Sequence, residues 1–143
     1  MLSEVANFFQ IVGFPLAILA LFLGWQQLQN AARTSKVQML LALDARLADF
    51  EDVRAKINAN AQDIDSVRLR RYIAVFERVG LALKDKQITL QQVDRYYGDR
   101  FVRLTKRQDA LSIVRNRDGW KDFYYLREAY DGYKMKLAEP PLK

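Results

Sequence analysis

The chain has 143 residues, a formal net charge of +6 at pH 7, 50% hydrophobic residues, and neither cysteine nor histidine. The missing cysteine excludes disulfides, thiolate nucleophiles and iron–sulfur clusters, and the missing histidine removes the commonest general base and the commonest zinc ligand. Because most familiar catalytic sites need one of these residue types, we expect that the chain is not an enzyme and binds no cofactor.

The first feature along the chain is a long segment without charge, residues 5–32. Its hydrophobic part, residues 5–25, is about twenty residues long, which matches a helix that crosses a hydrocarbon core of about 30 Å. Apolar side chains surround this helix on all sides, so that no polar stripe is left to face water. The sequence predicts a transmembrane helix with the membrane-spanning residues Phe8, Phe9, Ile11, Val12, Phe14, Leu16, Ile18, Leu19, Leu21, Phe22, Leu23 and Trp25.

The flanks of this segment predict its orientation. A cleaved signal peptide is the competing interpretation, but it would begin with a basic residue and end in a small-residue cleavage site, and neither feature occurs here. Basic side chains accumulate on the cytoplasmic side of a span. Since Arg33 and Lys36 follow the segment and only Glu4 precedes it, we expect the N-terminus outside and the rest of the chain in the cytoplasm.

A stalk helix is predicted to follow, because residues 26–58 contain neither glycine nor proline. Apolar side chains recur in it at spacings of three and four and form one stripe. Later helices of the same chain or a neighbouring chain must cover this stripe, and the short heptad pattern favours cover within the chain. The stripe comprises Met39, Leu40, Leu43, Leu47, Phe50, Val53 and Ile57.

A polar break at residues 58–63 precedes a second predicted helix, which begins near Asp65. Its apolar stripe is Leu69, Tyr72, Phe76, Val79 and Leu83. Thr89 and Gln92 then form a capping box at the start of a third helix over residues 90–97, with Ile88 and Val93 as the accompanying hydrophobic staple.

We expect a fourth helix over residues 101–114, separated from the third by a bend at Gly98. Residues 115–119 read as a turn, because they combine asparagine, aspartate and glycine. A last helix follows and ends at the proline pair Pro140 and Pro141. Its apolar stripe is Trp120, Phe123, Leu126, Tyr130, Tyr133 and Leu137.

No alternating run predicts a strand, so the expected fold class is all-α: a transmembrane helix that continues into a stalk helix and packs with a small helical bundle. The predicted organisation has an anchor with the start of the stalk at residues 1–32, a cytoplasmic helical domain at residues 33–139, and a tail at residues 140–143.

Two short motifs carry a family resemblance. Residues 76–83 contain Phe-Glu-x-Val-Gly, and residues 96–100 contain Tyr-Tyr-Gly-Asp-Arg, followed by Trp120 and Phe123. In this order they resemble a family of small uncharacterised bacterial single-pass membrane proteins. The resemblance implies a helical cytoplasmic domain at a bacterial inner membrane, and it implies no catalytic residues. From the residues themselves, we expect Gly80 to serve close helix packing and Gly98 to form a helix end or bend.

The excess positive charge is concentrated between Arg95 and Arg117, where seven basic residues stand against two acidic ones. Such a cluster can rest on anionic lipid or attract a nucleotide or nucleic acid, and it can equally be a solvated helix face. The candidate residues for binding anionic lipid or phosphate are Arg100, Arg103, Lys106, Arg107, Arg115 and Arg117.

The sequence gives weaker support for other kinds of functional site. The acidic residues of the first half lack the spacing of an EF-hand, and no phosphate-binding glycine motif occurs, so no metal site is expected. Helical spacing explains Tyr97 and Trp120 as core. That leaves Tyr96, Tyr124 and Tyr125 as candidates for a partner surface, because tyrosine is enriched at protein interfaces.

Two functional hypotheses follow. The first is a membrane-anchored interaction protein, an accessory subunit or adaptor that docks its basic helical domain on a larger membrane complex or on copies of itself. Tethering in the lipid bilayer raises the effective concentration of such a domain. The alternative is a small membrane effector, for instance in phage defence, which senses an anionic nucleotide or nucleic acid through its basic face.

Overall fold

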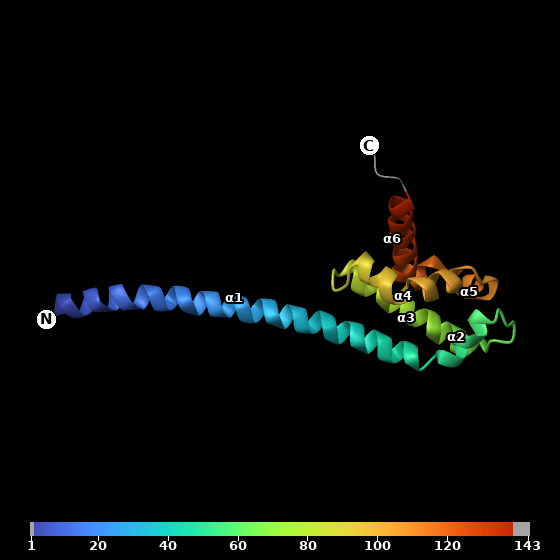
Figure 1. Ribbon diagram of the computed structural model, residues 1–143, viewed down its shortest axis with the longest axis horizontal. Coiled ribbons are helices and arrows are strands. Elements are labelled where there is room, and N and C mark those ends of the chain that lie inside the picture. The colour runs from blue at the N-terminus through green and yellow to red at the C-terminus, as the bar shows by residue number, and fades with distance from the viewer. Residues whose placement is uncertain (1, 139–143) are drawn as a thin grey trace. The chain divides into compact units, whose positions relative to one another are not determined.

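The computed structural model describes the backbone of residues 2–138 and the side chains of residues 18–138. The described backbone is mostly helical and has no strand, which confirms the all-α class (Figure 1). The helices are α1 (Leu2–Ala48), α2 (Glu51–Asn58), α3 (Ser66–Lys84), α4 (Leu90–Thr105), α5 (Gln108–Ile113), the 3-10 helix η1 (Arg117–Trp120) and α6 (Lys121–Ala138).

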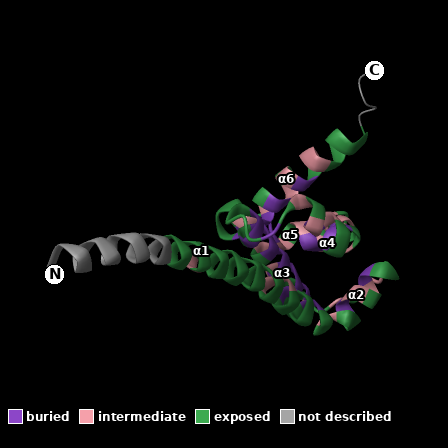
Figure 2. Cartoon of the chain, turned by 60° about the vertical axis from the view of Figure 1, so that its left-hand side comes forward, coloured by how far each residue is buried: buried purple, intermediate pink, exposed green. Residues whose placement is uncertain are grey.

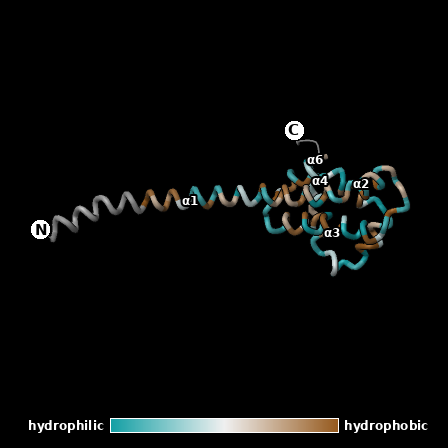
Figure 3. Tube along the Cα trace, turned by 90° about the horizontal axis from the view of Figure 1, so that it is seen from below, coloured by the Kyte–Doolittle hydropathy of each residue, from teal (hydrophilic) through white to brown (hydrophobic). Residues whose placement is uncertain are grey.

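The chain divides into two compact units, Met1–Gln38 and Met39–Lys143. We call them unit 1 and unit 2. Among residues 18–138, every buried hydrophobic side chain belongs to unit 2, and the cartoon in Figure 2 is coloured as buried along parts of α3. The described part of unit 1 lies within α1 and is exposed almost throughout, and Figure 3 shows that it begins with hydrophobic residues.

The apolar stripe predicted for the stalk is confirmed, but the continuous helix is wrong. Leu43, Leu47, Val53 and Ile57 are buried within the chain's own core. The helix, however, is interrupted between Ala48 and Glu51. Local sequence offers no reason for this break, because the cause lies on α3.

Two side chains of α3 stabilise the break between α1 and α2. Arg68 donates to the Asp49 carbonyl at 3.1 Å and to the Asp52 carboxylate at 2.6 Å, so the carbonyl that the broken helix leaves free is satisfied. Tyr72 packs against the Phe50 ring at a centroid distance of 5.9 Å. Tertiary contacts therefore override the local helix propensity.

Helix α3 is the predicted second helix, with Asp65 as its N-cap and all five stripe residues buried. One face of α3 docks the start of α6. The Glu77 carboxylate accepts hydrogen bonds from the backbone N–H groups of Asp122 and Phe123, and Lys84 forms an ion pair with Asp122 at 3.1 Å.

Gly80 lies between Glu77 and Lys84 on the same face of α3, because the three are spaced by three and four residues. A Cβ atom at Gly80 would overlap the backbone carbonyl of Asp122. The expectation that Gly80 serves close helix packing is confirmed. The Phe-Glu-x-Val-Gly motif thus has a structural role, since it holds α6 against α3.

A chain of aromatic rings runs through the core of unit 2. Tyr72 contacts Phe76 at 5.3 Å between centroids, and Phe76 contacts Phe101 at 5.5 Å. Phe101 also contacts Phe123 at 5.5 Å and Tyr130 at 5.9 Å. Phe101 of α4 therefore joins rings from α3 and α6.

The capping box of Thr89 and Gln92 is confirmed at the start of α4, and both staple residues are buried. The predicted bend at Gly98 is wrong, because α4 continues without interruption to Thr105. The hydroxyl of Tyr130 lies where a Gly98 side chain would be. This glycine therefore makes room for α6 and does not end a helix.

The predicted fourth helix is divided, because the chain leaves α4 at Lys106 and begins α5 at Gln108. The turn after α5 is present as residues 114–116 followed by η1. Trp120 lies directly before α6 and is buried, as are Phe123, Leu126 and Tyr130 of α6. The predicted apolar stripe is not buried at the C-terminal end of α6, where Leu137 is exposed. The predicted helix end at Pro140 lies outside the described residues.

Candidate functional site

The basic residues of the predicted anion-binding cluster fall in two places. Arg100 and Arg103 lie on α4, and Lys106 and Arg107 form its junction with α5. Arg115 and Arg117 lie at the turn after α5. A spacing of three places Arg100 and Arg103 on one face of α4, whereas Arg107 has extended backbone at the junction.

Ion pairs within the chain engage four of the six candidates. Arg103 pairs with Asp99 at 3.0 Å, and Arg107 pairs with Asp109 at 2.7 Å. Two longer contacts join Arg100 to Glu51 at 3.7 Å and Arg117 to Glu128 at 3.9 Å. Among the described residues, Lys106 and Arg115 form no ion pair. Much of the local charge is thus compensated.

Arg107 is the most constrained of these cations. Its Nε and Nη2 atoms donate to the two carboxylate oxygens of Asp109 at 2.9 and 2.7 Å, and Nη2 also donates to the Ala61 carbonyl at 2.7 Å. Only 10% of its side chain is exposed. The guanidinium therefore ties the junction of α4 and α5 to the loop between α2 and α3.

That loop is itself held in one conformation. The Asn60 and Ala61 N–H groups donate to the carbonyls of Ile57 and Lys56, which is the pattern of a Schellman motif. Asn60 has the left-handed φ of 53° that this motif requires, and asparagine tolerates this conformation well. Lys56 reaches across to Asp63, donating to its carbonyl at 3.0 Å and its carboxylate at 3.2 Å.

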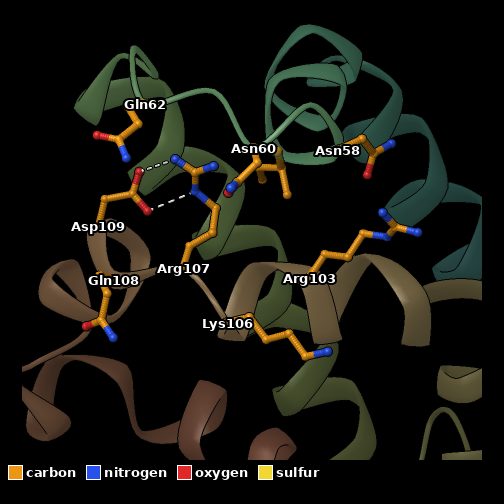
Figure 4. A pocket seen from close by; sticks show the side chains of 9 residues that line it. Asn58, Asn60, Gln62, Arg103, Lys106, Arg107, Gln108 and Asp109 are labelled. Carbon is orange, nitrogen blue, oxygen red and sulfur yellow. Dashed lines mark hydrogen bonds and ion pairs between the residues drawn. The ribbon is translucent and has the colours of Figure 1, made fainter.

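A cavity of about 630 Å³ lies between this loop and the junction of α4 and α5. Figure 4 shows the Arg107–Asp109 pair on the side of Gln62, while the Arg103 side chain extends toward Asn58. The cavity is lined by Ile57, Asn58, Asn60, Gln62, Arg103, Lys106, Arg107, Gln108 and Asp109. We call it the junction cavity. Three of the six predicted basic residues line it.

The four amide side chains of the junction cavity were not predicted from the sequence. Asn58, Asn60 and Gln62 stood out only as a polar break between helices, and Gln108 carried no signal. The break also contains Asn60, whose left-handed conformation follows the end of α2. A polar loop that faces a basic helix end is the feature that could have indicated them.

The Arg107–Asp109 pair predicts a specific response to acid. Hydrogen bonds from the Arg107 guanidinium lower the pKa of the Asp109 carboxyl. An aspartate in the unfolded chain takes up its proton near a pKa of about 3.9, so the stabilisation is complete above that pH and is lost as the pH falls through the lower folded pKa. We expect Asp109→Asn to reduce stability at neutral pH and to shrink the drop in melting temperature between about pH 5 and about pH 2.

The measurement is thermal unfolding of the full chain across this pH range. Asp131→Asn is the matched control, because Asp131 is exposed and forms no ion pair with any described residue. Identical acid responses of Asp109→Asn and the unsubstituted chain would contradict the prediction.

The three tyrosines predicted as a partner surface are not equivalent. Tyr96 on α4 and Tyr125 on α6 are exposed. Tyr124 is half-buried, donates to the Val114 carbonyl at 3.1 Å and lies under the Arg117 guanidinium at 4.5 Å. Tyr97 and Trp120, predicted as core, are buried. Two of the three candidates thus remain available to a partner.

The predicted membrane-spanning residues are only partly described. Side chains of Phe8, Phe9, Ile11, Val12, Phe14 and Leu16 lie outside the described residues. The other six, Ile18, Leu19, Leu21, Phe22, Leu23 and Trp25, are exposed on α1. Among the residues that were described, no helix offers a stretch with the length and hydropathy of a membrane span.

Neither protein-family models nor curated proteins nor solved structures give a match to this chain. The resemblance to small bacterial membrane proteins therefore stays a prediction. Within residues 18–138, no group of three or more acidic side chains is placed to hold a metal ion.

Proposed function

We propose that the chain is a membrane-anchored interaction protein: the uncharged N-terminal segment holds it in a bilayer, and unit 2 docks on a protein partner or on another copy. The observation that carries the proposal is the exposure of large apolar side chains on α1. Leu21 is 75% exposed, Phe22 61% and Trp25 63%. In water, exposing such a cluster is costly, so a bilayer is the more favourable surrounding.

The sequence around these residues supports a span that extends beyond the described side chains. Residues 11–25 contain no charged or amide side chain, and the candidate span includes residues 5–17, whose side chains lie outside the described part. Arg33 and Lys36 follow the segment, which favours a cytoplasmic location for the C-terminal part. The proposed location is the bacterial inner membrane, crossed once, with the N-terminus outside.

Unit 2 supports the docking role. Its core closes with hydrophobic side chains, and among the described residues no polar side chain is buried. The exposed Tyr96 and Tyr125 supply aromatic surface, which contributes strongly to protein interfaces. Because a membrane anchor raises the effective concentration of unit 2 for membrane-bound partners, a weak contact becomes persistent.

Charge in the proposed span should abolish anchoring. We expect Ile18→Asp/Leu21→Asp to move the full chain out of carbonate-washed membranes, because a carboxylate near the centre of a span costs about 2.5–3.5 kcal/mol. Leu28→Asp, beyond the apolar segment, is the control and should stay in the membrane. Recovery of the unsubstituted chain as a monodisperse species in detergent-free buffer would contradict the anchor.

Docking is tested separately on the full chain in mild detergent, where light scattering measures the protein mass. We expect a mass above that of one chain, and we expect Tyr96→Glu/Tyr125→Glu to reduce it to one chain. A single-chain mass for the unsubstituted protein, with no second protein retained, would contradict the docking role.

A further inference from the structure

The junction cavity has the composition of a site for a small anionic ligand. Its volume of about 630 Å³ falls in the range of small-molecule sites. Three cationic side chains line it against one carboxylate, together with four amides and a single apolar side chain, Ile57. This lining offers hydrogen-bond donors and positive charge to a polar, negatively charged ligand.

The single carboxylate does not neutralise the cavity. Asp109 is occupied by Arg107, so that Arg103, which pairs with Asp99, and Lys106 have no carboxylate partner among the lining residues. Asp99 accepts only from Nε of Arg103, at 3.0 and 3.2 Å, and the terminal nitrogens make no hydrogen bond with the described residues. Lys106 is exposed and forms no ion pair within the described part of the chain. Two cationic groups therefore remain able to donate to a ligand.

The walls of the cavity are already in place. Arg107 joins the two sides through the Ala61 carbonyl, and the Schellman motif at Asn60 fixes the loop. A preformed site loses little conformational entropy when a ligand binds. The hydrogen-bonded Arg107–Asp109 pair supports the wall, while Arg103 and Lys106 supply the attraction.

We propose that the junction cavity binds a phosphate group, whose oxygens accept hydrogen bonds from the Arg103 guanidinium, while Lys106, another lining residue, adds positive charge (Figure 4). A phosphate group suits this lining because its terminal oxygens are strong acceptors of charge-assisted hydrogen bonds. The amides of Asn58, Asn60 and Gln62 are placed to bind the polar remainder of the ligand. A free phosphate compound and a lipid headgroup share this chemistry. The proposal is independent of the anchor, because all lining residues belong to unit 2.

The test follows the side-chain amide signals of the cavity by NMR on the full chain, with two probes. Inorganic pyrophosphate is titrated into the protein in neutral detergent at constant ionic strength. In the second arm, the protein is placed in nanodiscs of phosphatidylcholine with or without phosphatidylglycerol. Saturable shifts with pyrophosphate assign a free phosphate ligand, and shifts seen only with phosphatidylglycerol assign a headgroup.

Matched variants separate a site from general attraction. Arg103→Gln/Lys106→Gln should weaken binding about tenfold or more, because charge-assisted hydrogen bonds are lost. Arg70→Gln/Arg71→Gln removes the same charge from exposed positions of α3 and should leave binding unchanged. Lys106→Gln alone keeps the test valid if the double variant unfolds. Absence of shifts with both probes, or equal weakening by both double variants, would overturn the proposal.

Discussion

Replacing Gly80 with alanine is expected to lower the free energy of unfolding of unit 2 by about 3 kcal/mol or more, the upper end of the range for overpacked sites. The added Cβ would overlap the backbone carbonyl of Asp122, and a backbone group cannot turn aside as a flexible side chain can. Helix α6 must therefore shift. That shift also weakens the hydrogen bonds that Glu77 accepts from Asp122 and Phe123.

Gly132→Ala provides the matched control, because nothing lies within 4 Å of a Cβ at that position of α6. In a helix interior, alanine is favoured over glycine by about 0.5–1 kcal/mol, so this variant should be slightly more stable. Urea unfolding followed by the fluorescence of buried Trp120, in a Trp25→Phe background, measures both changes. A loss at Gly80 no larger than about 1 kcal/mol would show that α6 does not need the close approach.

Phe101→Ala should cost about 3–5 kcal/mol, the usual range for removing a buried phenylalanine. The Phe101 side chain is 1% exposed and contacts the rings of Phe76, Phe123 and Tyr130. Alanine would leave a cavity where α3, α4 and α6 meet. Because three helices line that cavity, local collapse cannot fill it without moving a helix.

Met135→Ala is the control for Phe101, since it removes a large apolar side chain that is exposed on α6. Its effect should stay within about 0.5 kcal/mol. The same unfolding experiment compares the two variants. Similar losses at both positions would contradict the assignment of Phe101 as the residue that joins the three helices.

Much of the fold could be predicted because its information is local or periodic. The stripe on α3 from Leu69 to Leu83 follows directly from the helical repeat, and every member is buried. The capping box at Thr89 depends on two side chains three residues apart, so it too can be recognised from the sequence. These features need no knowledge of distant residues.

The break after Ala48 and the uninterrupted course of α4 through Gly98 could not be predicted, because distant side chains determine them. The break after Ala48 depends on Arg68 and Tyr72 of α3. Gly98 looked like a bend because glycine is a weak helix former, yet it lies inside α4 where Tyr130 needs the space. The same residue type can end a helix or admit a neighbour, and only the packing decides between them.

The positive charge of the candidate site could be predicted from the sequence, but the arrangement of its residues in space could not. Clustering along the chain was enough to single out Arg103, Lys106 and Arg107. The position of Asn60 across the cavity from Arg107 requires the loop between α2 and α3 to lie beside the end of α4. That proximity joins segments more than forty residues apart, as the hydrogen bond from Arg107 to Ala61 shows.

The docking of α6 on α3 also affects how unit 2 folds during its synthesis on the ribosome. While the nascent chain ends before Lys121, the face of α3 around Gly80 has no partner, and the apolar side chains beside it stay open to water. Exposed surface of this kind makes incomplete chains prone to aggregate. Premature termination ahead of α6 would therefore produce substrates for chaperones and proteases, and not a smaller functional module.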